Sequence, residues 1–393
     1  MTDTPDPVRR TPWPASASRP LNSPIQPSVV YASHSPDALD AQYDGRTPGY
    51  TYAREGHPNA TVLAGRIDAL EGAEGGIVTG SGMASVTVAL MALARAGDHV
   101  VGGDQLYGRS LRLLRDELPG WGIATTLADP TDAAAIEAAL RPETRAVLVE
   151  VVSNPTLRVA DIAGIAALCR ARGVALVIDN TFTTPRGFRA LDAGADVVIH
   201  SVTKMLAGHS DATLGYVAAR DPALRARIEG LAVTMGLTPS PFDCWLAERG
   251  MLSFALRYDR AEANAAALAD HIAGLPGVVR ALYPLRPDHP DHNRARGLLG
   301  ARGGHMVSFV IDGGRAAANA LVQAAPQIAF APTLGDIGTT LSHPASSSHR
   351  ALSAEAREAL GMTEGFFRIS VGCEEIEGLK DAFSRAISAA TGV

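Results

Sequence analysis

The stretch with the most evident chemistry is HSVTKMLAGHSD, residues His200 to Asp211. It follows ADVVI, an apolar run that is typical of a buried strand. Desolvating an ammonium group is costly, so burial lowers the pKa of a lysine amine from about 10.4 toward neutrality. An uncharged lysine amine attacks carbonyl groups and forms Schiff bases. Lys204 is therefore the first candidate catalytic residue, and membership of a structural ion pair is the alternative.

Pyridoxal phosphate is the common aldehyde partner of such a lysine, and it needs an acid near its pyridine nitrogen. Asp179 lies at the end of VALVIDN, 25 positions before Lys204. One connection between neighbouring strands would place both side chains at the same edge of a sheet. Asp179 is therefore the candidate acid, although a strand-end aspartate is more often a cap or turn residue.

The same cofactor needs a cradle for its phosphate. GSGM, residues 80–83, comes at a predicted helix start, where free N–H groups and the positive end of the helix dipole favour an anion. Hydroxyls and a cation for the phosphate are available at Tyr52, Arg54, Ser201 and Thr203. A GSG before a helix is usually only a tight turn, so the ordered combination with Lys204 favours the cofactor.

The strands that position these residues are predicted from three apolar runs, RAVLVEVV, VALVIDN and ADVVIHS. The runs do not alternate with polar residues, and a helical pattern, DIAGIAALCRARG, separates the first two, with Asp161 as its N-cap and Gly173 as its stop. Such runs predict a parallel sheet covered on both faces, with ligands at the carboxyl ends of its strands. The polar residues expected at that edge are Glu150 with Asn154, Asp179 with Asn180, and Ser201 to Lys204.

The chain divides into three parts in this interpretation. Residues 1–60 form an arm rich in proline and serine, which ends in the loop-like segment QYDGRTPGYTYAREGHPN. Residues 61–250 form the α/β domain that binds the cofactor. Residues 251–393 begin with MLSFALRYDRAEANAAALADHIAGL, which predicts one long helix. They continue as a smaller α+β domain with strands HMVSFVID and FFRISVG and the closing helix EEIEGLKDAFSRAI.

Composition excludes several functional classes. The 393 residues are 46% apolar and 19% charged, which allows a sizeable core. The net charge of -6 gives no electrostatic footprint for nucleic acid, and no apolar run reaches membrane-spanning length. The N-terminal segment lacks the apolar core of a signal peptide. Three widely spaced cysteines, Cys169, Cys244 and Cys373, argue against a disulfide framework, so we expect a cytoplasmic protein.

Histidine pairs raise the question of a metal site. DHPDHN contains His289 and His292, and HPASSSH contains His343 and His349. Neither pair has convincing ligand spacing with a carboxylate or cysteine partner, so we expect no metal.

From about Tyr50 to the C-terminus, the chain resembles the Cys/Met metabolism family of pyridoxal-phosphate enzymes. The match at SVTK…GHSD is the most specific one. The resemblance implies pyridoxal-phosphate-dependent transferase fold type I, with a large, mostly parallel sheet domain and a smaller C-terminal α+β domain. It also implies a homotetramer, a dimer of dimers, with active sites shared between subunits.

Residue roles also follow from the resemblance. Lys204 is implied to be the catalytic lysine that carries the cofactor, and Tyr107 of LYGR to stack on its ring and act as an acid or base. The other implied cofactor contacts are Tyr52, Arg54, Ser81, Gly82, Met83, Asn154, Asp179, Ser201 and Thr203. The implied substrate contacts are Arg368 of FRISVG, which clamps the carboxylate, with Asn154, Thr333 and Tyr52. A planar guanidinium suits a carboxylate better than a lysine does, and a surface ion pair is the alternative for Arg368.

The activity that the resemblance implies is γ-elimination or γ-replacement on a homoserine-derived amino acid, a trans-sulfuration reaction. Cystathionine γ-lyase and cystathionine γ-synthase are the nearest activities, and O-acylhomoserine sulfhydrylase and methionine γ-lyase are the alternatives. Pro332 stands where typical cystathionine γ-enzymes have a glutamate, and Arg109 and Ser110 stand near the position where methionine γ-lyases have a cysteine. Arg109 is our candidate partner for an anionic leaving group.

Two alternatives come from other functional classes. A pyridoxal-phosphate aminotransferase would need a second half-reaction with a keto acid, and a coupled assay separates it from an enzyme that releases ammonia. An α/β protein with a non-catalytic lysine would give a colourless preparation.

Overall fold

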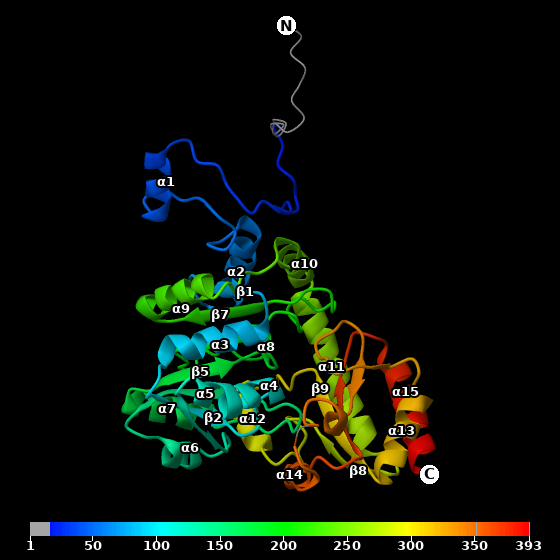
Figure 1. The fold of residues 1–393 in the computed structure, drawn as a ribbon. Helices are drawn as coiled ribbons and strands as arrows, with labels where there is room; N and C mark the ends of the chain where they lie inside the picture. The colour runs from blue at the N-terminus through cyan, green and yellow to red at the C-terminus, as the bar shows by residue number, and fades with distance from the viewer. Residues whose placement is uncertain (1–15, 351, 393) are drawn as a thin grey trace.

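The computed structural model describes residues 16–350 and 352–392, which contain two β-sheets with helices around them. Figure 1 shows the larger sheet beside the smaller one, with helix α11 (Phe254–Ala273) running between them. Within the described residues, no helix combines the length and the apolar character needed to span a bilayer.

Seven strands form the larger sheet in the order β1-β7-β6-β5-β4-β2-β3. Their bounds are β1 Ile77–Thr79, β2 His99–Gly103, β3 Ala124–Ala128, β4 Thr144–Glu150, β5 Ala175–Asp179, β6 Val197–Ser201 and β7 Gly215–Ala219. Strands β6, β5, β4, β2 and β3 are parallel neighbours, whereas β7 is antiparallel to both β6 and β1. The predicted, mostly parallel sheet is therefore confirmed, whereas the antiparallel direction of β7 was not predicted.

Both faces of the larger sheet are covered, as the unbroken apolar runs predicted. Leu176 and Ile178 of β5 belong to the hydrophobic cluster that contains Ile165 of α7 (Ile162–Arg172). Val177, between them, belongs to the opposite cluster, which contains Val88 of α3 (Gly82–Leu93). Alternate side chains of one strand thus pack on helices at opposite faces.

Helix α7 begins and ends where its sequence predicts. The Asp161 carboxylate accepts a hydrogen bond from the Gly164 N–H at 3.2 Å, and Gly173 ends the helix with φ 63°. The remaining helices of this part are α2 Pro58–Glu71, α4 Gly108–Arg112, the π-helical turn η1 Leu113–Glu117, α5 Leu118–Gly120, α6 Ala133–Ala139, α8 Thr184–Gly187, α9 Pro222–Thr234 and α10 Pro241–Met251.

Five strands form the smaller sheet in the order β10-β11-β12-β9-β8. Their bounds are β8 Val278–Leu282, β9 Met306–Ile311, β10 Ala329–Phe330, β11 Thr340–Ser342 and β12 Phe366–Ser370. The associated helices are α12 His292–Leu299, α13 Gly314–Ala324, the 3-10 turn η2 Pro344–Ser346, α14 Ala354–Ala359 and α15 Ile376–Thr391. The predicted long helix, the two strands and the closing helix are confirmed as α11, β9, β12 and α15.

The smaller sheet also uses both of its faces. Val307 and Phe309 of β9 pack with α11, α13 and α15, whereas Met306 and Val310 belong to the cluster of the larger sheet. The two sheets therefore share a continuous apolar contact, and a cavity at this seam has walls from both. We keep 1–60, 61–250 and 251–393 as a proposed domain division.

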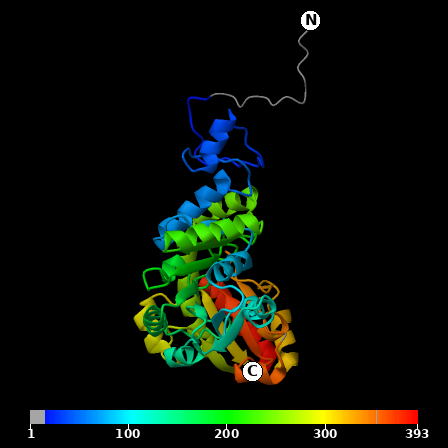
Figure 2. The same ribbon diagram turned by 60° about the vertical axis from the view of Figure 1, so that its left-hand side comes forward.

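The described N-terminal segment lies apart from the two sheets. Figures 1 and 2 show helix α1 (Pro36–Tyr43) beyond the end of the sheet body, and the helix has no buried residue. Ser35 caps it by accepting a hydrogen bond from the Ala38 N–H at 3.1 Å. This helix was not predicted from the sequence, whereas the segment between Asp44 and His57 has the expected loop-like character.

Candidate active site

The carboxyl ends of β4, β5 and β6 meet at a cavity of about 240 Å³. Glu150 pairs with Asp179 in the sheet register, and Ser201 ends the next strand along. All three residues line the cavity, as do Asn154 and Lys204. The edge predicted from the sequence is therefore the edge where the cavity lies.

Lys204 stands in the turn between β6 and the antiparallel strand β7. The Thr203 hydroxyl closes this turn, because it accepts a hydrogen bond from the Leu214 N–H at 2.9 Å and donates one to the Leu214 carbonyl at 3.2 Å. The Lys204 Nζ donates to Thr333 Oγ1 at 3.4 Å, and within the described residues it has no hydrogen bond to a carboxylate. Thus the geometry does not favour the ion-pair alternative.

Burial is the main cause that lowers the pKa of Lys204, and the positive charge of Arg368 adds to it. Both effects disfavour the ammonium form relative to the free amine. Lys204 is therefore placed and tuned as a nucleophile or a base.

Two carboxyl groups, those of Glu150 and Asp179, line the cavity, and burial raises the pKa of each. The pKa of Glu150 is raised well above its ordinary value, and the charge of Asp179 contributes to this. At Asp179 the rise in pKa is opposed by Thr181, whose N–H donates to Asp179 Oδ1 at 3.0 Å, and by the charge of His200. Glu150 instead accepts a hydrogen bond from the Tyr107 N–H at 2.7 Å and so fixes the loop that carries Tyr107.

The N-terminus of α3 forms the third wall of the cavity. Ser81 caps the helix by accepting a hydrogen bond from the Ala84 N–H at 3.2 Å, and Gly82 and Met83 follow in the first turn. A Cβ atom at Gly82 would lie 2.7 Å from the Ser201 Cβ, so a side chain does not fit there. The first-turn N–H groups and the helix dipole make this wall an anion site.

Arg368 reaches the cavity from β12 of the smaller sheet. Its Nη1 donates to Asn154 Oδ1 at 2.6 Å, and its Nη2 donates to the Thr333 carbonyl at 2.6 Å. Burial lowers the pKa of Arg368 to about 10, so the guanidinium remains charged at neutral pH. The residue is 5% exposed, which excludes the surface ion pair, and its Nε has no hydrogen-bond partner in the described part of the chain. A buried cation of this kind fits a carboxylate.

The remaining predicted residues fall into two groups, those that line the cavity and those that do not. Tyr107 lines the cavity and is 41% exposed, but Tyr52 and Arg54 do not line it in the single chain. The Arg54 guanidinium lies 5.1 Å from the Tyr52 ring centroid and pairs with Glu55. Arg109 is exposed on α4 and is also outside the lining, whereas Thr333 and Pro332 lie within it.

Asn180 faces away from the cavity. Its Nδ2 donates to Glu71 Oε1 at 2.9 Å and to the Phe188 carbonyl at 2.7 Å. Asn180 therefore stabilises the loop after β5.

Sequence reasoning missed two residues that shape the site. Thr181 Oγ1 accepts a hydrogen bond from the Ser201 N–H at 2.7 Å and so links β5 to β6; its signal was a hydroxyl two positions after Asp179, typical of an Asx turn. Arg257 of α11 donates to the carbonyls of Met205 at 2.8 Å and Leu206 at 3.0 Å, which stabilises the turn after Lys204. No sequence pattern connects Arg257 to that turn.

Together these groups could hold an aromatic aldehyde that carries a basic ring nitrogen and a phosphate, next to an amino acid carboxylate. Within the described residues, no group of three or more histidine, cysteine, aspartate or glutamate side chains could hold a metal ion.

Comparison with known proteins agrees with this chemistry. A family model described as Cys/Met metabolism PLP-dependent enzyme matches residues 10–388. The chain is 36% identical over 370 residues to the L-methionine gamma-lyase of Pseudomonas putida, which covers 94% of this chain and 93% of the relative. It is 37% identical over 349 residues to the O-succinylhomoserine sulfhydrylase of Pseudomonas aeruginosa, covering 89% of this chain and 86% of the relative.

A solved structure of cystathionine gamma synthase from Xanthomonas oryzae pv. oryzae, in complex with aminoacrylate and cysteine, has a similar fold. The TM-score is 0.89 at 34% sequence identity, with 94% of each chain covered.

Proposed function

Because the chain belongs to the Cys/Met metabolism PLP-dependent enzyme family, we propose that it catalyses γ-elimination or γ-replacement on a homoserine-derived amino acid. The reaction makes or breaks a carbon–sulfur bond, as in a cystathionine γ-lyase or γ-synthase. The observation that carries this proposal is the cavity in which the Lys204 amine, the Asp179 carboxylate and the Arg368 guanidinium converge.

The residues around the cavity fit pyridoxal phosphate. Lys204 would hold its aldehyde carbon, Asp179 its ring nitrogen, and the α3 N-terminus at Ser81, Gly82 and Met83 its phosphate, together with Ser201 and Thr203. The cradle at Gly82, which a Cβ would fill, is the structural feature that favours this fit. When bound, the cofactor supplies an electron sink for a carbanion at the substrate.

Substrate orientation is the task of Arg368 and Asn154. The guanidinium binds the amino acid carboxylate, and Asn154, already hydrogen-bonded to Arg368, completes that contact. Thr333 holds Lys204 and Arg368 on the same wall, because its side chain contacts the amine and its carbonyl accepts from the guanidinium.

Proton transfer is the task of Lys204 and Tyr107. Lys204 removes the proton from the substrate Cα and then acts at Cβ, which its lowered pKa favours at neutral pH. Tyr107, which lines the cavity and is 41% exposed, would stack on the cofactor ring and exchange a proton with the substrate. The Asp179 carboxylate would stabilise a proton on the ring nitrogen of the bound cofactor.

The protein forms a homotetramer, a dimer of dimers, in which Tyr52 and Arg54 of a second copy complete the phosphate site and contact the substrate. Two features support this proposal. Tyr52 and Arg54 lie outside the cavity of their own chain, and helix α1 of the same segment has no buried residue in the single chain. We also propose a cytoplasmic location, which the three free cysteines support.

O-acylhomoserine sulfhydrylase is the second candidate function. The charged residues that line the cavity are Glu150, Asp179, Lys204 and Arg368. The outer wall, residues 332–348, contributes Pro332, Leu334 and serine hydroxyls among its described lining residues. Asp336 of this segment does not line the cavity and accepts a hydrogen bond from Ser210 Oγ at 2.5 Å, so none of the described lining residues of this wall offers a carboxylate to the distal ammonium group of cystathionine. The wall therefore suits an uncharged or anionic leaving group.

The test is a substrate survey with the purified enzyme and pyridoxal phosphate. Cystathionine, methionine, cysteine and O-acylhomoserines are supplied with and without thiols, and the products are identified by mass spectrometry. We expect a keto acid with ammonia release, or a thioether when a thiol is present. Amino transfer that depends on an added keto acid, or no product from any of these amino acids, would contradict the proposal.

A further inference from the structure

Asn154 is part of a short loop that follows β4, residues 153–159, which we name the Asn154 loop. The loop is closed on itself. The Ser153 N–H donates to the Arg158 carbonyl at 2.9 Å, and the Leu157 N–H donates to the Ser153 carbonyl at 3.0 Å. These hydrogen bonds link the two ends of the loop, so a contact at one end also helps to place Asn154 at the other.

The inner side of the Asn154 loop rests on the smaller sheet. Ser308 Oγ donates to the Pro155 carbonyl at 2.7 Å, and Arg368 Nη1 donates to Asn154 Oδ1 at 2.6 Å. Ser308 and Arg368 are directly paired between β9 and β12. Two neighbouring contacts thus hold the loop on its cavity side.

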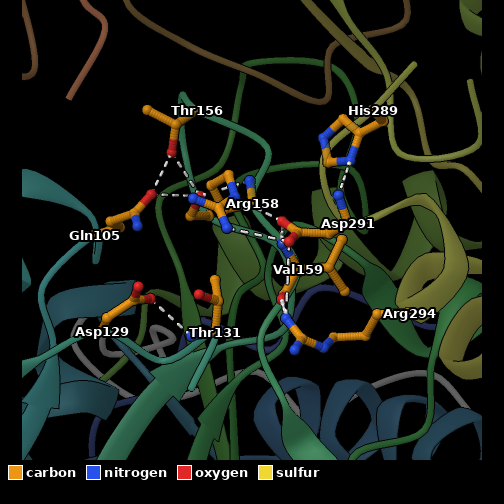
Figure 3. A network of polar contacts seen from close by, with 10 residues as sticks. Gln105, Asp129, Thr131, Thr156, Arg158, Val159, His289, Asp291 and Arg294 are labelled. Atoms are coloured by element: carbon orange, nitrogen blue, oxygen red, sulfur yellow. Dashed lines mark hydrogen bonds and ion pairs between the residues drawn. The ribbon is translucent and has the colours of Figure 1, made fainter. Parts of the chain in front are cut away.

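The outer side of the loop is held by Asp291, next to the first residue of α12. Asp291 Oδ2 accepts hydrogen bonds from Arg158 Nε at 2.6 Å and from the Val159 N–H at 3.0 Å, and its Oδ1 accepts one from Arg158 Nη2 at 3.1 Å (Figure 3). The Arg294 guanidinium adds a hydrogen bond to the Val159 carbonyl at 3.0 Å. This end of the loop is thus held by both side-chain and main-chain contacts.

Burial makes the Asp291 contacts matter. The Asp291 side chain is only 7% exposed, and Asp291 N donates to His289 Nδ1 at 3.1 Å. Burial raises the pKa of Asp291, but the hydrogen bonds from Arg158 and Val159 outweigh it, so the pKa is lowered and the group is an anion at neutral pH. Buried hydrogen bonds between charged partners cost much more to break than exposed ones.

A third contact links the Asn154 loop to the loop that carries Tyr107. Gln105 Oε1 accepts hydrogen bonds from Thr156 Oγ1 at 2.6 Å and from Ser153 Oγ at 3.3 Å. Figure 3 shows Gln105 and Asp291 on different sides of the Asn154 loop. The loop is therefore fixed between the Tyr107 loop and the segment that contains Asp291.

We propose that Asp291 is a positioning residue for substrate binding: it holds the Asn154 loop so that Asn154 and Arg368 together present a preformed carboxylate site. The inference rests on the proposed role of Arg368. Asp291 touches neither substrate nor cofactor, and it acts through Arg158 and Val159. Its loss leaves Lys204 and Asp179 in place and loosens only the carboxylate end of the cavity.

The test compares D291N with D259N. Asp259 forms a two-point pair with Arg186, at 2.7 Å and 2.5 Å, between α8 and α11, and it also accepts a hydrogen bond from Arg302 at 2.8 Å. Its side chain is 43% exposed, and none of its hydrogen bonds within the described residues goes to the Asn154 loop. In D291N we expect the KM for the amino acid to rise by at least about tenfold with kcat kept, because a buried charged hydrogen-bond network is lost from the binding site. D259N should keep the KM of the wild type. R158K, which retains the charge but loses the two-point geometry, should raise the KM by less.

Hydrogen exchange provides a readout that does not depend on turnover. The amides of residues 157–159 should exchange faster in D291N than in the wild type and D259N. An unchanged KM in D291N overturns the inference, and so does an equal rise in D259N. If the wild type turned over no amino acid, the proposed function would fail, and hydrogen exchange would then decide the inference. Unchanged protection of the amides of residues 157–159 in D291N overturns it, and lost protection supports it.

Discussion

Lys204 and Lys380 are the two lysines in the 393-residue chain. Lys380 lies on α15 and pairs with Glu377 at 2.8 Å, whereas Lys204 lines the cavity with its pKa lowered by burial and by Arg368. A covalent adduct on a lysine side chain thus has two possible positions, and their environments differ sharply.

Lys204→Ala should reduce turnover by at least about a thousandfold, because the amine that we propose holds the cofactor and moves the proton is lost. The measurement is product formation by Lys204→Ala and by Lys380→Ala as its matched control. Borohydride treatment of the wild type, followed by digestion and mass spectrometry, should add a pyridoxyl group to the peptide that contains Lys204. An adduct found on Lys380 instead would remove the basis for the proposed chemistry.

At the residue scale, the sequence predicts best where chemistry is local to a strand end. Lys204 and Asp179 follow apolar runs, so the parallel-sheet rule alone brings them together. Arg368 and Asn154 are hydrogen-bonded across 214 positions, and in the sequence only the resemblance to a family associates them. The contact of Arg257 with the turn after Lys204 could not be predicted, because Arg257 binds main-chain carbonyl groups, which every residue type carries.

The N-terminus of α3 shows how one element prepares a binding wall. Ser81 satisfies one N–H of the first turn, and the absence of a side chain at Gly82 leaves the others accessible beside Ser201. Anion binding by this helix end requires the anion to approach the backbone closely, which is the reason for glycine at position 82.

Gly82→Ala should weaken pyridoxal phosphate binding by at least about tenfold, because the new Cβ would overlap Ser201 and displace the helix end from the phosphate. The dissociation constant is measured by absorbance titration of the cofactor-free protein. Gly65→Ala in α2, whose Cβ would meet no atom within 4 Å, is the control. Equal affinity in Gly82→Ala and Gly65→Ala would show that the phosphate lies elsewhere.

At the element scale, unbroken apolar runs predicted β4, β5 and β6, and capping residues predicted the ends of α7. The direction of β7 was not predicted, because pairing direction depends on the connection after Lys204, which Thr203 and Arg257 stabilise through tertiary contacts. Helix α1 was missed because its eight residues present no apolar stripe, and it contributes no buried side chain.

At the scale of the whole molecule, the proposed phosphate site needs residues from a second copy of the chain. Arg54 lies outside its own cavity, so the proposed shared site requires a second copy. Arg54→Ala and Lys204→Ala should each be inactive alone. Mixed oligomers of the two variants should recover up to about a quarter of wild-type turnover. Random pairing makes about half of the dimers mixed, and each mixed dimer has one intact site out of two. Activity is measured after the subunits are mixed and exchanged. Hybrids without recovery would indicate that each chain builds its own site.

Acid sensitivity is a second property of the whole molecule. Burial, with a contribution from Arg368, lowers the pKa of His305 from 6.5 to about 3, and burial with nearby arginines lowers that of His349 to about 4. In the unfolded chain these side chains bind protons below pH 6.5, whereas in the folded chain they stay neutral. The unfolded state therefore binds more protons in this window, and the free energy of unfolding falls as the pH drops from 6.5 toward 3.

His305→Phe should remove part of that acid sensitivity. A single group with this shift costs about 2 kcal/mol of folding stability at pH 5 relative to pH 7.5. Urea unfolding at both pH values should show a loss smaller by this amount in the variant than in the wild type. His34→Phe, in the exposed N-terminal segment, is the control and should keep the wild-type loss. A loss in His305→Phe as large as that of the wild type would contradict the buried neutral state of this histidine.

The lining of the cavity comes from both sheets, so one part of it can be changed while another part is kept. The lining residues of the larger sheet would be constrained by the cofactor, and so would Thr333, which contacts Lys204 and Arg368. The other lining residues of 332–348 would be constrained mainly by the leaving group. Exchanging residues 332–348 for the corresponding segment of a relative, with Thr333 and Gly335 kept, should consequently change the preferred amino acid while the absorbance spectrum stays unchanged.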